Sequence, residues 1–493
     1  MNPKLKESLK LLAAVCFWIA VWAVASFLVD QPLLLPGPAA VAVQLARLLG
    51  SAGFWTTVGT SMGRVLLGVL LGAALGIALA ALGARFSLIR AAVGPLLTVI
   101  KSTPVASFTI LVLLWLRRDL VPAFIAALIV LPVVWANVSA GIRDTDPLLL
   151  ELARACRLSP WRTLRRIRIP SVLPQLRAAL QSALGFGWKA GVAAEVLTLP
   201  QHSIGRMIYE SKLYLQTTEL FAWTVAVVLL SLVIEKLLLR LLAVKLPGRS
   251  DPGLRQSAAP AADASPVAAA HDAPGMPAPS AQDRSRAGSP QPPAPAVPAL
   301  ILDRISLSFD GKPVFADLSL SLAAGERVAL MGPSGCGKTS LLRLAAGLLA
   351  PSSGKTERAA ERIAVCFQEP RLLPWRTAAE NVNLVLSDRS ATMGEAERLL
   401  SRLGLDPAAL KQYPAALSGG MRQRVALART LAQKGDLLLL DEPFKALDAA
   451  LRSQVIEAVL AESSGAAVLL VTHDKAEAEA LGCRIAEFSS LLG

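Results

Sequence analysis

Long apolar stretches alternate with short polar connections over the first half of the chain, and the pattern changes after a polar interval. Each of six stretches is long enough to form a helix across a bilayer, which takes about 20 residues. From Leu300 onward, short β-like runs alternate with helical patterns, which is typical of an α/β domain. The six stretches lie at Leu11–Val29, Val65–Leu82, Ala91–Leu116, Leu120–Ala140, Leu176–Leu199 and Leu220–Val244. The β-like runs include Arg327–Met331, Ile363–Phe367, Leu437–Leu440 and Ala467–Val471.

The polar interval, Pro247–Pro298, consists largely of Pro, Ala, Ser, Gly and Asp. It has almost no large apolar residue with which to form a core, so we expect a disordered linker. The chain is therefore predicted to be multidomain: an all-α polytopic membrane domain of six helices over residues 1–246, the linker over 247–298 and an α/β domain over 299–493. In the second apolar stretch, Gly68, Gly72 and Gly76 recur every four residues and predict a smooth face for close helix packing.

Composition and charge agree with a membrane domain. Of 493 residues, 54% are hydrophobic and 17% are charged, which excludes a disordered or wholly soluble chain. The formal charge of +14 lies in the first 298 residues, because residues 299–493 hold 22 basic and 22 acidic residues. Cytoplasmic loops that follow the positive-inside bias explain this excess better than a nucleic-acid patch, so we expect no nucleic-acid partner. With the N-terminus inside, the predicted inner segments before the last span carry thirteen Lys and Arg residues against six outside.

The first apolar stretch has a second interpretation. Lys4, Lys6 and Lys10 precede it and Ala23-Val24-Ala25 is similar to a cleavage site, as in a secretory signal. We favour an uncleaved helix, because an even number of spans returns the C-terminal half to the cytoplasm. The cysteines include no CxxC pair and predict reduced thiols, with neither a disulfide framework nor a metal site. They are Cys16, Cys156, Cys336, Cys366 and Cys483.

A phosphate-loop pattern, Gly332-Pro333-Ser334-Gly335-Cys336-Gly337-Lys338-Thr339, follows the β-like run Val328–Met331. Its glycines let the backbone wrap closely around phosphates, and successive amides with a helix N-terminus supply positive potential. Lys338 is expected to reach the outer phosphates and Thr339 to bind Mg²⁺. The alternative is a glycine-rich turn without a ligand. The predicted nucleotide-binding residues here are Gly332, Ser334, Gly335, Gly337, Lys338, Thr339 and Ser340.

Two carboxylates, Asp441 and Glu442, follow the apolar run Leu437–Leu440. At the end of a buried strand, Asp441 suits Mg²⁺ and Glu442 suits a base for an attacking water. Upstream, Leu417-Ser418-Gly419-Gly420-Met421-Arg422-Gln423 resembles the signature of the ATP-binding cassette (ABC) family. This resemblance implies a P-loop ABC ATPase domain with ATP and Mg²⁺ as cofactors.

Further residues match the family's pattern in order. By this resemblance, Gln368 senses Mg²⁺ and water, His473 contacts the γ-phosphate and Phe309 stacks on adenine; Gln368, Glu442 and His473 are then the catalytic residues. Lys445 departs from the pattern, because a small residue often stands before the D-loop alanine. By the same resemblance, the signature residues Ser418, Gly419, Gly420 and Gln423 would reach a nucleotide from the opposite copy. Ala446-Leu447-Asp448 resembles the family's D-loop, and Asp448 is a predicted nucleotide-binding residue.

The connection 144–175, between the fourth and fifth stretches, resembles the EAA loop of bacterial binding-protein-dependent importers. The matching residues are Glu151-Leu152-Ala153-Arg154, Leu158-Ser159, Trp161 and Ile169-Pro170, of which Glu151, Ala153 and Arg154 are the predicted coupling residues. Such a short amphipathic helix can dock in a groove of an ATPase domain and transmit its movement. Leu152 and Arg157 depart from the pattern, Arg157 standing where the loop usually has Gly. A basic helix on anionic lipid is the alternative.

Within importers, Leu35–Pro38, Thr103-Pro104 and Trp188–Glu195 resemble the nitrate, sulfonate and taurine permease branch. Lys189 and Glu195 lie inside the fifth apolar stretch, where a charge costs several kcal/mol unless it is paired or hydrated. They should therefore face the bundle interior or a pathway. Six residues apart, they do not share a helix face. Both gate-lining and structural roles stay open for them.

Together these features imply ATP-driven import of a small solute, such as a sulfonate, nitrate or taurine-like compound. The expected protein is a homodimer with twelve spans and two ATP sites in the bacterial inner membrane, with the ATPase domain cytoplasmic. A separate periplasmic or lipid-anchored solute-binding protein is implied. The alternatives are an ABC exporter half-transporter, which the short membrane region and the EAA-like loop disfavour, and a membrane-anchored non-transporting ATPase, which the intramembrane charges disfavour.

Overall fold

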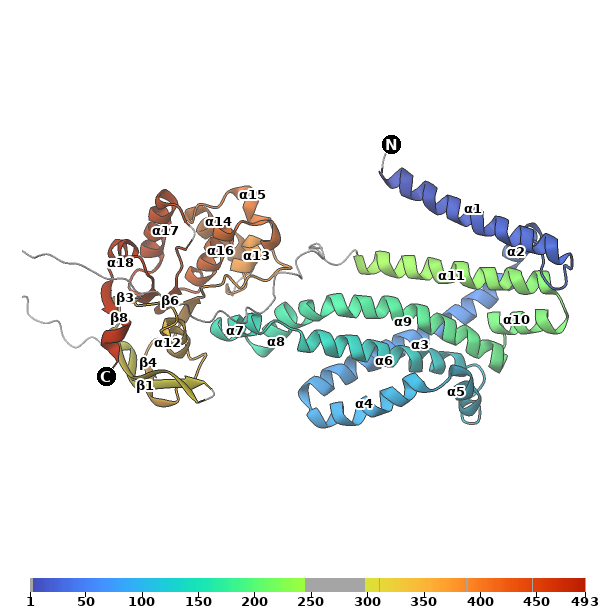
Figure 1. The fold of residues 1–493 in the computed structure, drawn as a ribbon, viewed down its shortest axis with the longest axis horizontal. Helices are drawn as coiled ribbons and strands as arrows, with labels where there is room; N and C mark the ends of the chain where they lie inside the picture. Colours follow the sequence, from blue (N-terminus) through green and yellow to red (C-terminus); the bar gives the residue numbers. More distant parts are fainter. Residues whose placement is uncertain (1–2, 244–297, 310, 387–388, 446, 493) are drawn as a thin grey trace, which may run out of the picture. The chain divides into compact units, whose positions relative to one another are not determined.

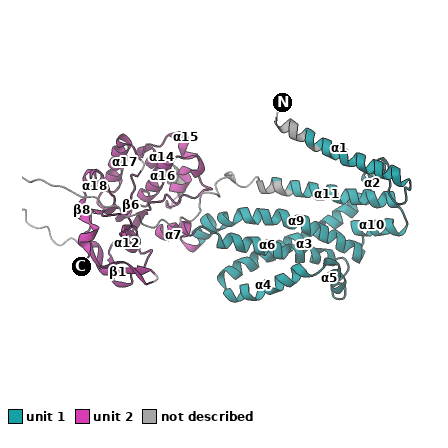
Figure 2. Cartoon of the chain, viewed as in Figure 1, with its two compact units in different colours: residues 1–146, 161–246 teal, residues 147–160, 247–493 magenta. Residues whose placement is uncertain are grey.

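The computed structural model describes residues 3–243, 298–309, 311–386, 389–445 and 447–492, which pack as two compact units (Figure 2). The first contains the described residues of 1–146 and 161–246, and the second those of 147–160 and 247–493. Most of the predicted linker, residues 247–297, and the D-loop residue Ala446 lie outside the described residues. The predicted domain limits stay predictions, but residues 147–160 of the EAA-like loop pack with the C-terminal unit.

Three long helices, α3, α6 and α9, lie side by side in the first unit (Figure 1). Their buried side chains include Val65, Val130 and Trp188. A bilayer-length helix forms at each predicted apolar stretch except the third, because uninterrupted apolar sequence satisfies its backbone hydrogen bonds within the helix. The helices of this unit are α1 (Pro3–Val29), α2 (Pro38–Leu49), α3 (Ala52–Arg85), α4 (Ser87–Ser102), α5 (Val105–Val112), α6 (Val121–Arg143), the short α8 (Pro160–Thr163) with the π-helical turn Leu164–Arg168 after it, α9 (Ile169–Thr198), α10 (Ile204–Leu213) and α11 (Thr217–Ala243).

The glycine repeat of α3 packs directly against the backbone of α6. A Cβ atom added at Gly68 would lie 2.1 Å from the carbonyl oxygen of Ala123, and one at Gly72 would lie 2.4 Å from that of Ala127. At Gly76 the corresponding distance to the carbonyl oxygen of Leu131 is 2.9 Å. The close approach is possible only without side chains, so the predicted smooth packing face is confirmed.

The third predicted stretch, Ala91–Leu116, is not one straight helix. It contains most of α4 and all of α5, which meet at a bend of 105°. Pro104 explains the break, because it disfavours helical backbone at Thr103, which is extended with ψ 128°, and it cannot donate to the helix ladder.

Among the described residues, four helices are long and apolar enough to cross a membrane, or five spans if the bent pair counts as one. The four are α1, α3, α6 and α11. The fifth predicted stretch, Leu176–Leu199, lies in α9, whose 30 residues are long enough but include Lys189 and Glu195. The total of six spans stays a prediction.

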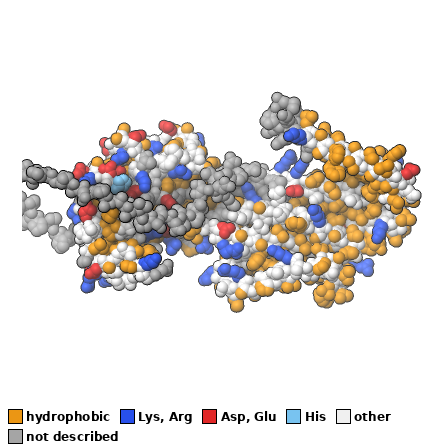
Figure 3. Space-filling view, in the orientation of Figure 1, with side chains coloured by type: hydrophobic (Ala, Val, Ile, Leu, Met, Phe, Trp, Pro, Cys, Tyr) orange, Lys and Arg blue, Asp and Glu red, His pale blue; other side chains and the backbone are white. Residues whose placement is uncertain are grey.

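Large apolar side chains cover much of the outer surface of the first unit (Figure 3). Leu70 on α3 is 67% exposed and Trp18 on α1 is 68% exposed. A contiguous apolar exterior is expected of helices that face lipid and would be a liability in water. The first unit is therefore a multi-pass membrane domain. All five cysteines are free.

The second unit contains two sheets. A three-stranded antiparallel sheet has the order β2-β1-β4, and a five-stranded parallel sheet has the order β5-β6-β7-β3-β8. The strands of the parallel sheet's centre read as continuous apolar runs because helices bury both faces. The strands are β1 (Pro298–Phe309), β2 (Lys312–Ala323), β3 (Arg327–Met331), β4 (Ser353–Arg358), β5 (Ile363–Cys366), β6 (Leu437–Asp441), β7 (Ala467–Val471) and β8 (Arg484–Glu487).

The predicted α/β domain is thereby confirmed, and its topology gathers the sequence motifs. The loops that follow β3, β5, β6 and β7 all leave the same edge of the parallel sheet, where α/β proteins place their ligands. The helices of this unit are α7 (Pro147–Ala155), α12 (Lys338–Ala345), α13 (Ala378–Val382), α14 (Arg389–Arg402), α15 (Pro407–Leu410), α16 (Gly419–Leu431), α17 (Ala449–Glu462) and α18 (Lys475–Ala480).

Candidate functional site

The predicted phosphate loop joins the end of β3 to the start of α12. Gly335 and Gly337 have φ values of +82° and +107°, which side-chain-bearing residues rarely adopt. A Cβ atom at Gly337 would lie 2.9 Å from the Phe315 ring, so the loop also needs glycine there for space. The Lys338 Nζ donates hydrogen bonds to the carbonyl oxygens of Gly332 (2.8 Å) and Pro333 (2.7 Å). The loop thus presents backbone amides, a helix N-terminus and an ammonium group to one place, as an anion site requires.

Asp441 ends β6 beside this loop. It is 4% exposed, and its Oδ2 accepts a hydrogen bond of 2.9 Å from the Thr339 hydroxyl. Burial raises the pKa of Asp441 above its ordinary value, and the hydrogen bond from Thr339 partly opposes that shift. A hydroxyl and a carboxylate held side by side are the hard oxygen donors that Mg²⁺ prefers, so this pair fits the predicted metal.

Glu442 occupies the turn directly after β6, with an unusual φ of +44°. Its Oε2 accepts hydrogen bonds from Gln368 Nε2 (3.0 Å) and Lys445 Nζ (2.9 Å), and its Oε1 lies 3.7 Å from His473 Nδ1. Burial raises the pKa of this carboxyl. The hydrogen bonds from Lys445 and Gln368, together with the positive charge of Lys445, lower it by more, so the pKa of Glu442 is below its ordinary value. Glu442 is therefore an anion at neutral pH and can accept a hydrogen bond from water.

The three residues predicted to be catalytic, Gln368, Glu442 and His473, are thus brought together from three different loops. The sequence did not predict the contact that Lys445 makes. Lys445 attracted attention only as a departure from the family pattern, and its position three residues after Glu442 is what lets the two side chains meet. Its side chain is 59% exposed, so the ion pair is partly screened by solvent.

The remaining predicted nucleotide contacts lie on other elements. Ser418 caps α16 by accepting from the amide of Met421, and Asp448 caps α17 by accepting from the amide of Leu451. Phe309, at the end of β1, is 49% exposed. Among the described residues, no hydrogen bond or ion pair joins these three residues to the phosphate loop of the same chain. Their predicted nucleotide contacts stay predictions.

Helix α7 carries the predicted coupling residue Glu151, which pairs with two arginines of the second unit. Glu151 Oε2 lies 3.0 Å from Arg371 Nη1, and Glu151 Oε1 lies 3.2 Å from Arg343 Nε. Arg371 follows Gln368 by three residues, and its guanidinium lies 3.6 Å from the centre of the Phe367 ring. Ala153 is buried, whereas Arg154 is exposed. One ion pair therefore connects the EAA-like helix to the segment of Gln368.

Two further arginines support this connection. Arg157 adopts φ +46°, the left-handed conformation for which glycine is usual, and its guanidinium donates to the carbonyl oxygen of Glu361. The turn therefore forms with arginine in place of glycine. Arg429, 2% exposed on α16, donates to the carbonyl oxygens of Pro370 (2.8 Å) and Arg371 (2.9 Å). The sequence gives no local signal for Arg371 or Arg429, because their partners are distant along the chain.

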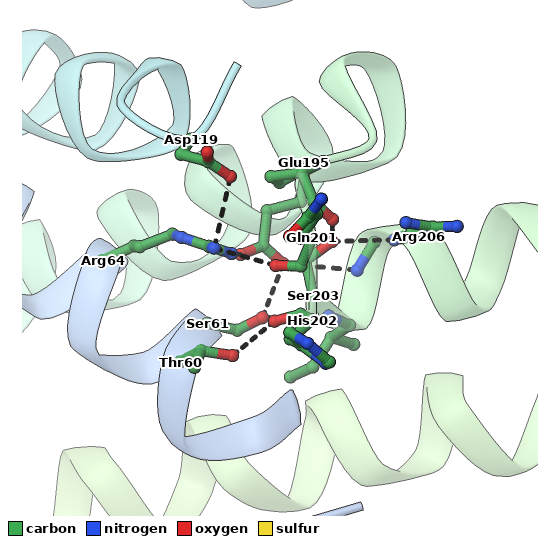
Figure 4. Close-up of polar contacts among 12 residues, drawn as sticks. Thr60, Ser61, Arg64, Asp119, Glu195, Gln201, His202, Ser203 and Arg206 are labelled. Atoms are coloured by element: carbon green, nitrogen blue, oxygen red, sulfur yellow. Dashed lines mark hydrogen bonds and ion pairs between the residues drawn. The ribbon is translucent and has the colours of Figure 1, made fainter. Parts of the chain in front are cut away.

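In the first unit the two intramembrane charges have different surroundings. Glu195 is fully buried and accepts hydrogen bonds from the Ser61 hydroxyl (2.8 Å) and the Gly205 amide (3.2 Å) (Figure 4). Arg64 Nη1 lies 3.8 Å from Glu195 Oε1, while Arg64 Nη2 donates to the Gln201 carbonyl oxygen and lies 3.4 Å from Asp119. Glu195 thus ties α3 to the first turn of α10.

Lys189 is exposed, and in the described part of the chain it pairs with no acidic side chain. The prediction that the two charges do not share a helix face is confirmed. Of the two residues predicted to line a pathway, Glu195 is therefore a buried and paired carboxylate, and Lys189 is an exposed ammonium group. Sequence reasoning missed Ser61 and Arg64, more than 130 residues from Glu195.

Two family models match the chain. The model described as "Binding-protein-dependent transport system inner membrane component" matches residues 68–245, and the model described as "ABC transporter" matches residues 315–445. The chain is 49% identical over 190 residues to the "Aliphatic sulfonates import ATP-binding protein SsuB" of Granulibacter bethesdensis, covering 38% of this chain and 79% of that protein. It is 41% identical over 207 residues to the "Taurine import ATP-binding protein TauB" of Shigella dysenteriae, covering 39% and 81%.

Proposed function

Because the chain belongs to the ABC transporter family, with a binding-protein-dependent permease and an ATPase fused in one polypeptide, we propose that it imports a small sulfonate-type anion as a homodimer. The protein is an ATP-hydrolysing importer. One observation carries the proposal: a permease match and an assembled phosphate site occur in the same chain as an ATPase region 49% identical to a sulfonate-import relative. Nitrate and taurine-like compounds are the other candidates from the same branch.

The homodimer follows from the inventory of motifs. The chain has one phosphate loop and one signature, and within the described residues no hydrogen bond joins Ser418 to the loop. In the proposed dimer, each nucleotide lies between the phosphate loop of one copy and the signature of the other, so neither copy completes a site alone. Two sites and two permease units then form one transporter, with ATP binding favouring one conformation over the other.

Hydrolysis is assigned to the groups around Glu442. This carboxylate, held as an anion by Lys445 and Gln368, orients and deprotonates the attacking water, while Lys338 and the loop amides hold the phosphates. His473, close to Glu442, contacts the γ-phosphate in this proposal. Thr339 and Asp441, with Gln368, would hold Mg²⁺, which when bound supplies positive charge to neutralise the phosphate oxygens.

We propose that Glu151 transmits the conformational change of the ATPase domain to the EAA-like helix α7. The contacts of Glu151 with Arg371, and of Arg429 with the carbonyl oxygens of Pro370 and Arg371, connect the segment of Gln368 to α7 and to the signature helix α16. A shift of Gln368 or of α16 would therefore displace α7. We place the ATPase domain in the cytoplasm of a bacterial cell and the permease in its inner membrane, which agrees with the positive-inside bias.

Specificity is proposed to depend chiefly on a separate solute-binding protein. The permease match is to a family described as binding-protein-dependent, so such a partner is implied. A periplasmic or lipid-anchored protein would deliver the solute to the outer side of the first unit. Substrate choice is then a property of two proteins, of which this chain is one.

The test is uptake into proteoliposomes that contain the full chain, with ATP inside and a cognate solute-binding protein added outside. We expect uptake of radiolabelled ethanesulfonate that requires both ATP and the binding protein. Glu442→Gln should abolish it, whereas Ser453→Ala, an exposed position on α17, should not. Binding-protein-independent export of ethanesulfonate, or ATP hydrolysis without movement of ethanesulfonate, taurine or nitrate in the complete system, would refute the proposal.

A further inference from the structure

One stripe of α9 is left uncovered by the rest of the described first unit. Its members recur every three or four residues, which is the spacing of one helix face. A Cβ atom at Gly185 on this stripe would meet nothing within 4 Å. The opposite face, with Leu184, Trp188, Val192 and Glu195, is buried against the bundle. The exposed residues of the stripe are Ser182, Phe186, Lys189, Ala193 and Leu197.

Lys189 is the one charged residue among those five, and it lies near the middle of the apolar stretch Leu176–Leu199. At a rise of about 1.5 Å per residue, it is about 20 Å along the helix from Leu176 and about 15 Å from Leu199. A four-carbon side chain is too short to carry the ammonium to either end of such a span. Lys189 therefore cannot reach an interface in the way that charged residues near helix ends do.

The charge of Lys189 is not neutralised within the described chain. Glu195 lies on the other face of α9 and is already bonded to Ser61, Gly205 and Arg64. Glu235 on α11 accepts a hydrogen bond from Gln181, two turns of α9 away from Lys189. An unpaired ammonium at mid-span against lipid costs about 2.5–3.5 kcal/mol or more, so the stripe must face water or protein.

We propose that the α9 stripe lines the substrate path, with the second copy of the chain as the opposite wall, and that Lys189 selects an anionic substrate. This inference rests on the proposed function and deepens it, because it assigns the charge selection to one residue. A two-fold axis places a Lys189 from each copy along the same path. A sulfonate carries one negative charge that never protonates near neutral pH, so it gains from this field, whereas cations are repelled.

Glu195 has a different role. Its two carboxylate oxygens face Ser61, Gly205 and Arg64 inside the bundle, where a passing solute cannot meet them. It connects the N-terminal half of α3 to the first turn of α10 and so positions α9. Of the two charged residues in this stretch, only Lys189 is therefore available to a solute.

The experiment measures the electrostatic field on the stripe without measuring transport. Ala193→Cys places a thiol one turn from Lys189, and the full-length protein in nanodiscs reacts with either methanethiosulfonate ethylsulfonate, an anion, or methanethiosulfonate ethyltrimethylammonium, a cation. Peptide mapping by mass spectrometry locates the label, so the native cysteines remain. Leu70→Cys, on the apolar exposed face of α3, is the matched control.

We expect the introduced thiol at position 193 to react with both reagents and the control thiol at position 70 to react with neither, because a thiol in lipid does not ionise. Neighbours at i and i+4 are about 6 Å apart, so even in bulk water the Lys189 charge changes the anion-to-cation rate ratio by about tenfold. Lys189→Gln should lower that ratio by this factor, and Lys189→Arg should keep it.

Failure of the thiol at position 193 to react would show that the stripe is not water-filled and would overturn the proposal. If the Lys189→Gln variant elutes as a folded dimer and its anion-to-cation rate ratio is unchanged, the role of Lys189 is overturned. Uptake of ethanesulfonate by the wild-type chain is measured in parallel. If uptake fails while the ratio falls as expected, the proposed substrate is wrong but the anion-selecting path stands.

Discussion

Replacing Glu151 by Gln should release α7 from the ATPase unit. The two arginines that Glu151 contacts differ in burial: the Arg371 side chain is 4% exposed and the Arg343 side chain is 38% exposed, and Glu151 itself is 16% exposed. Burial lowers the pKa of Arg371, and the charge of Glu151 opposes that shift. Removing the carboxylate therefore leaves Arg371 buried without a counter-charge, whereas Arg343 can be hydrated.

The magnitude follows from these exposures. Breaking a buried ion pair costs about 3–5 kcal/mol, because the remaining charge is uncompensated. A solvent-exposed pair contributes about 0.2–1 kcal/mol. Since Glu151 is not fully buried, we take the lower limit for its pair with Arg371, about 3 kcal/mol, and about 0.5 kcal/mol for its pair with Arg343.

Native-state hydrogen exchange of the full-length protein in nanodiscs measures this directly as the opening free energy of α7, residues Pro147–Ala155. Glu151→Gln removes both pairs, and at 1.36 kcal/mol per factor of ten a loss of about 3.5 kcal/mol accelerates exchange of α7 amides about 400-fold. Glu151→Gln should show this acceleration, while amides of α10 in the other unit exchange unchanged. Arg343→Met should accelerate α7 only about twofold.

A double-mutant cycle decides whether the contact is the cause. Arg371→Met alone should loosen α7, and Glu151→Gln combined with Arg371→Met should lose less than the sum of the two single effects, because the second change removes the orphaned charge. If the losses of α7 stability in the two single variants simply add in the double variant, the Glu151–Arg371 pair is not the main link between α7 and the ATPase unit. An effect of Arg343→Met as large as that of Arg371→Met would refute the assignment in the same way.

Three further outcomes are expected. Glu442→Gln should keep ATP binding, measured with a fluorescent ATP analogue, yet reduce ATP turnover by at least about a hundredfold, because it removes the carboxylate that we propose activates water. Turnover within about tenfold of wild type would contradict this proposed role. Lys445→Ala removes a cation 2.9 Å from Glu442, so the pKa of Glu442 should rise. The acid limb of the pH profile of ATPase activity should then move to higher pH by less than about one unit. A limb that stays in place or moves to lower pH would contradict this effect of Lys445 on Glu442. Gly72→Ala forces α3 away from α6 and should destabilise the protein by about 1–3 kcal/mol in thermal unfolding, whereas Gly59→Ala on the same helix, with nothing within 4 Å, should not destabilise it.

Several elements were predictable because their causes are local in the chain. The β-like run before the phosphate loop forms β3, and the run before Asp441 forms β6, since continuous apolar residues suit strands buried on both faces. The glycine period in α3 was sufficient to predict a close-packed face. The bend at Thr103 was missed although Pro104 signals it, because an apolar stretch of bilayer length was given more weight than proline's effect on the preceding residue.

The site was predictable as a set of residues but not as a set of contacts. Family-like motifs identified Gln368, Glu442 and His473, and parallel topology brings their loops to one edge of the sheet. The partners that set the charge state of Glu442 and hold Glu151 could not be read in the same way. Lys445 and Arg371 are ordinary basic residues in the sequence, and only side-chain geometry makes them partners.

Periodicity and short spacing were enough to predict long apolar helices, the glycine-rich turn after β3 and the strand that ends in Asp441. Tertiary structure alone decided the fate of the two intramembrane charges. Glu195 pairs with Arg64 and accepts a hydrogen bond from Ser61, both over 130 residues away, while Lys189 remains exposed on the other face of the same helix. Burial and ion pairing depend on which distant surfaces meet, and that is a property of packing between helices rather than of any one segment.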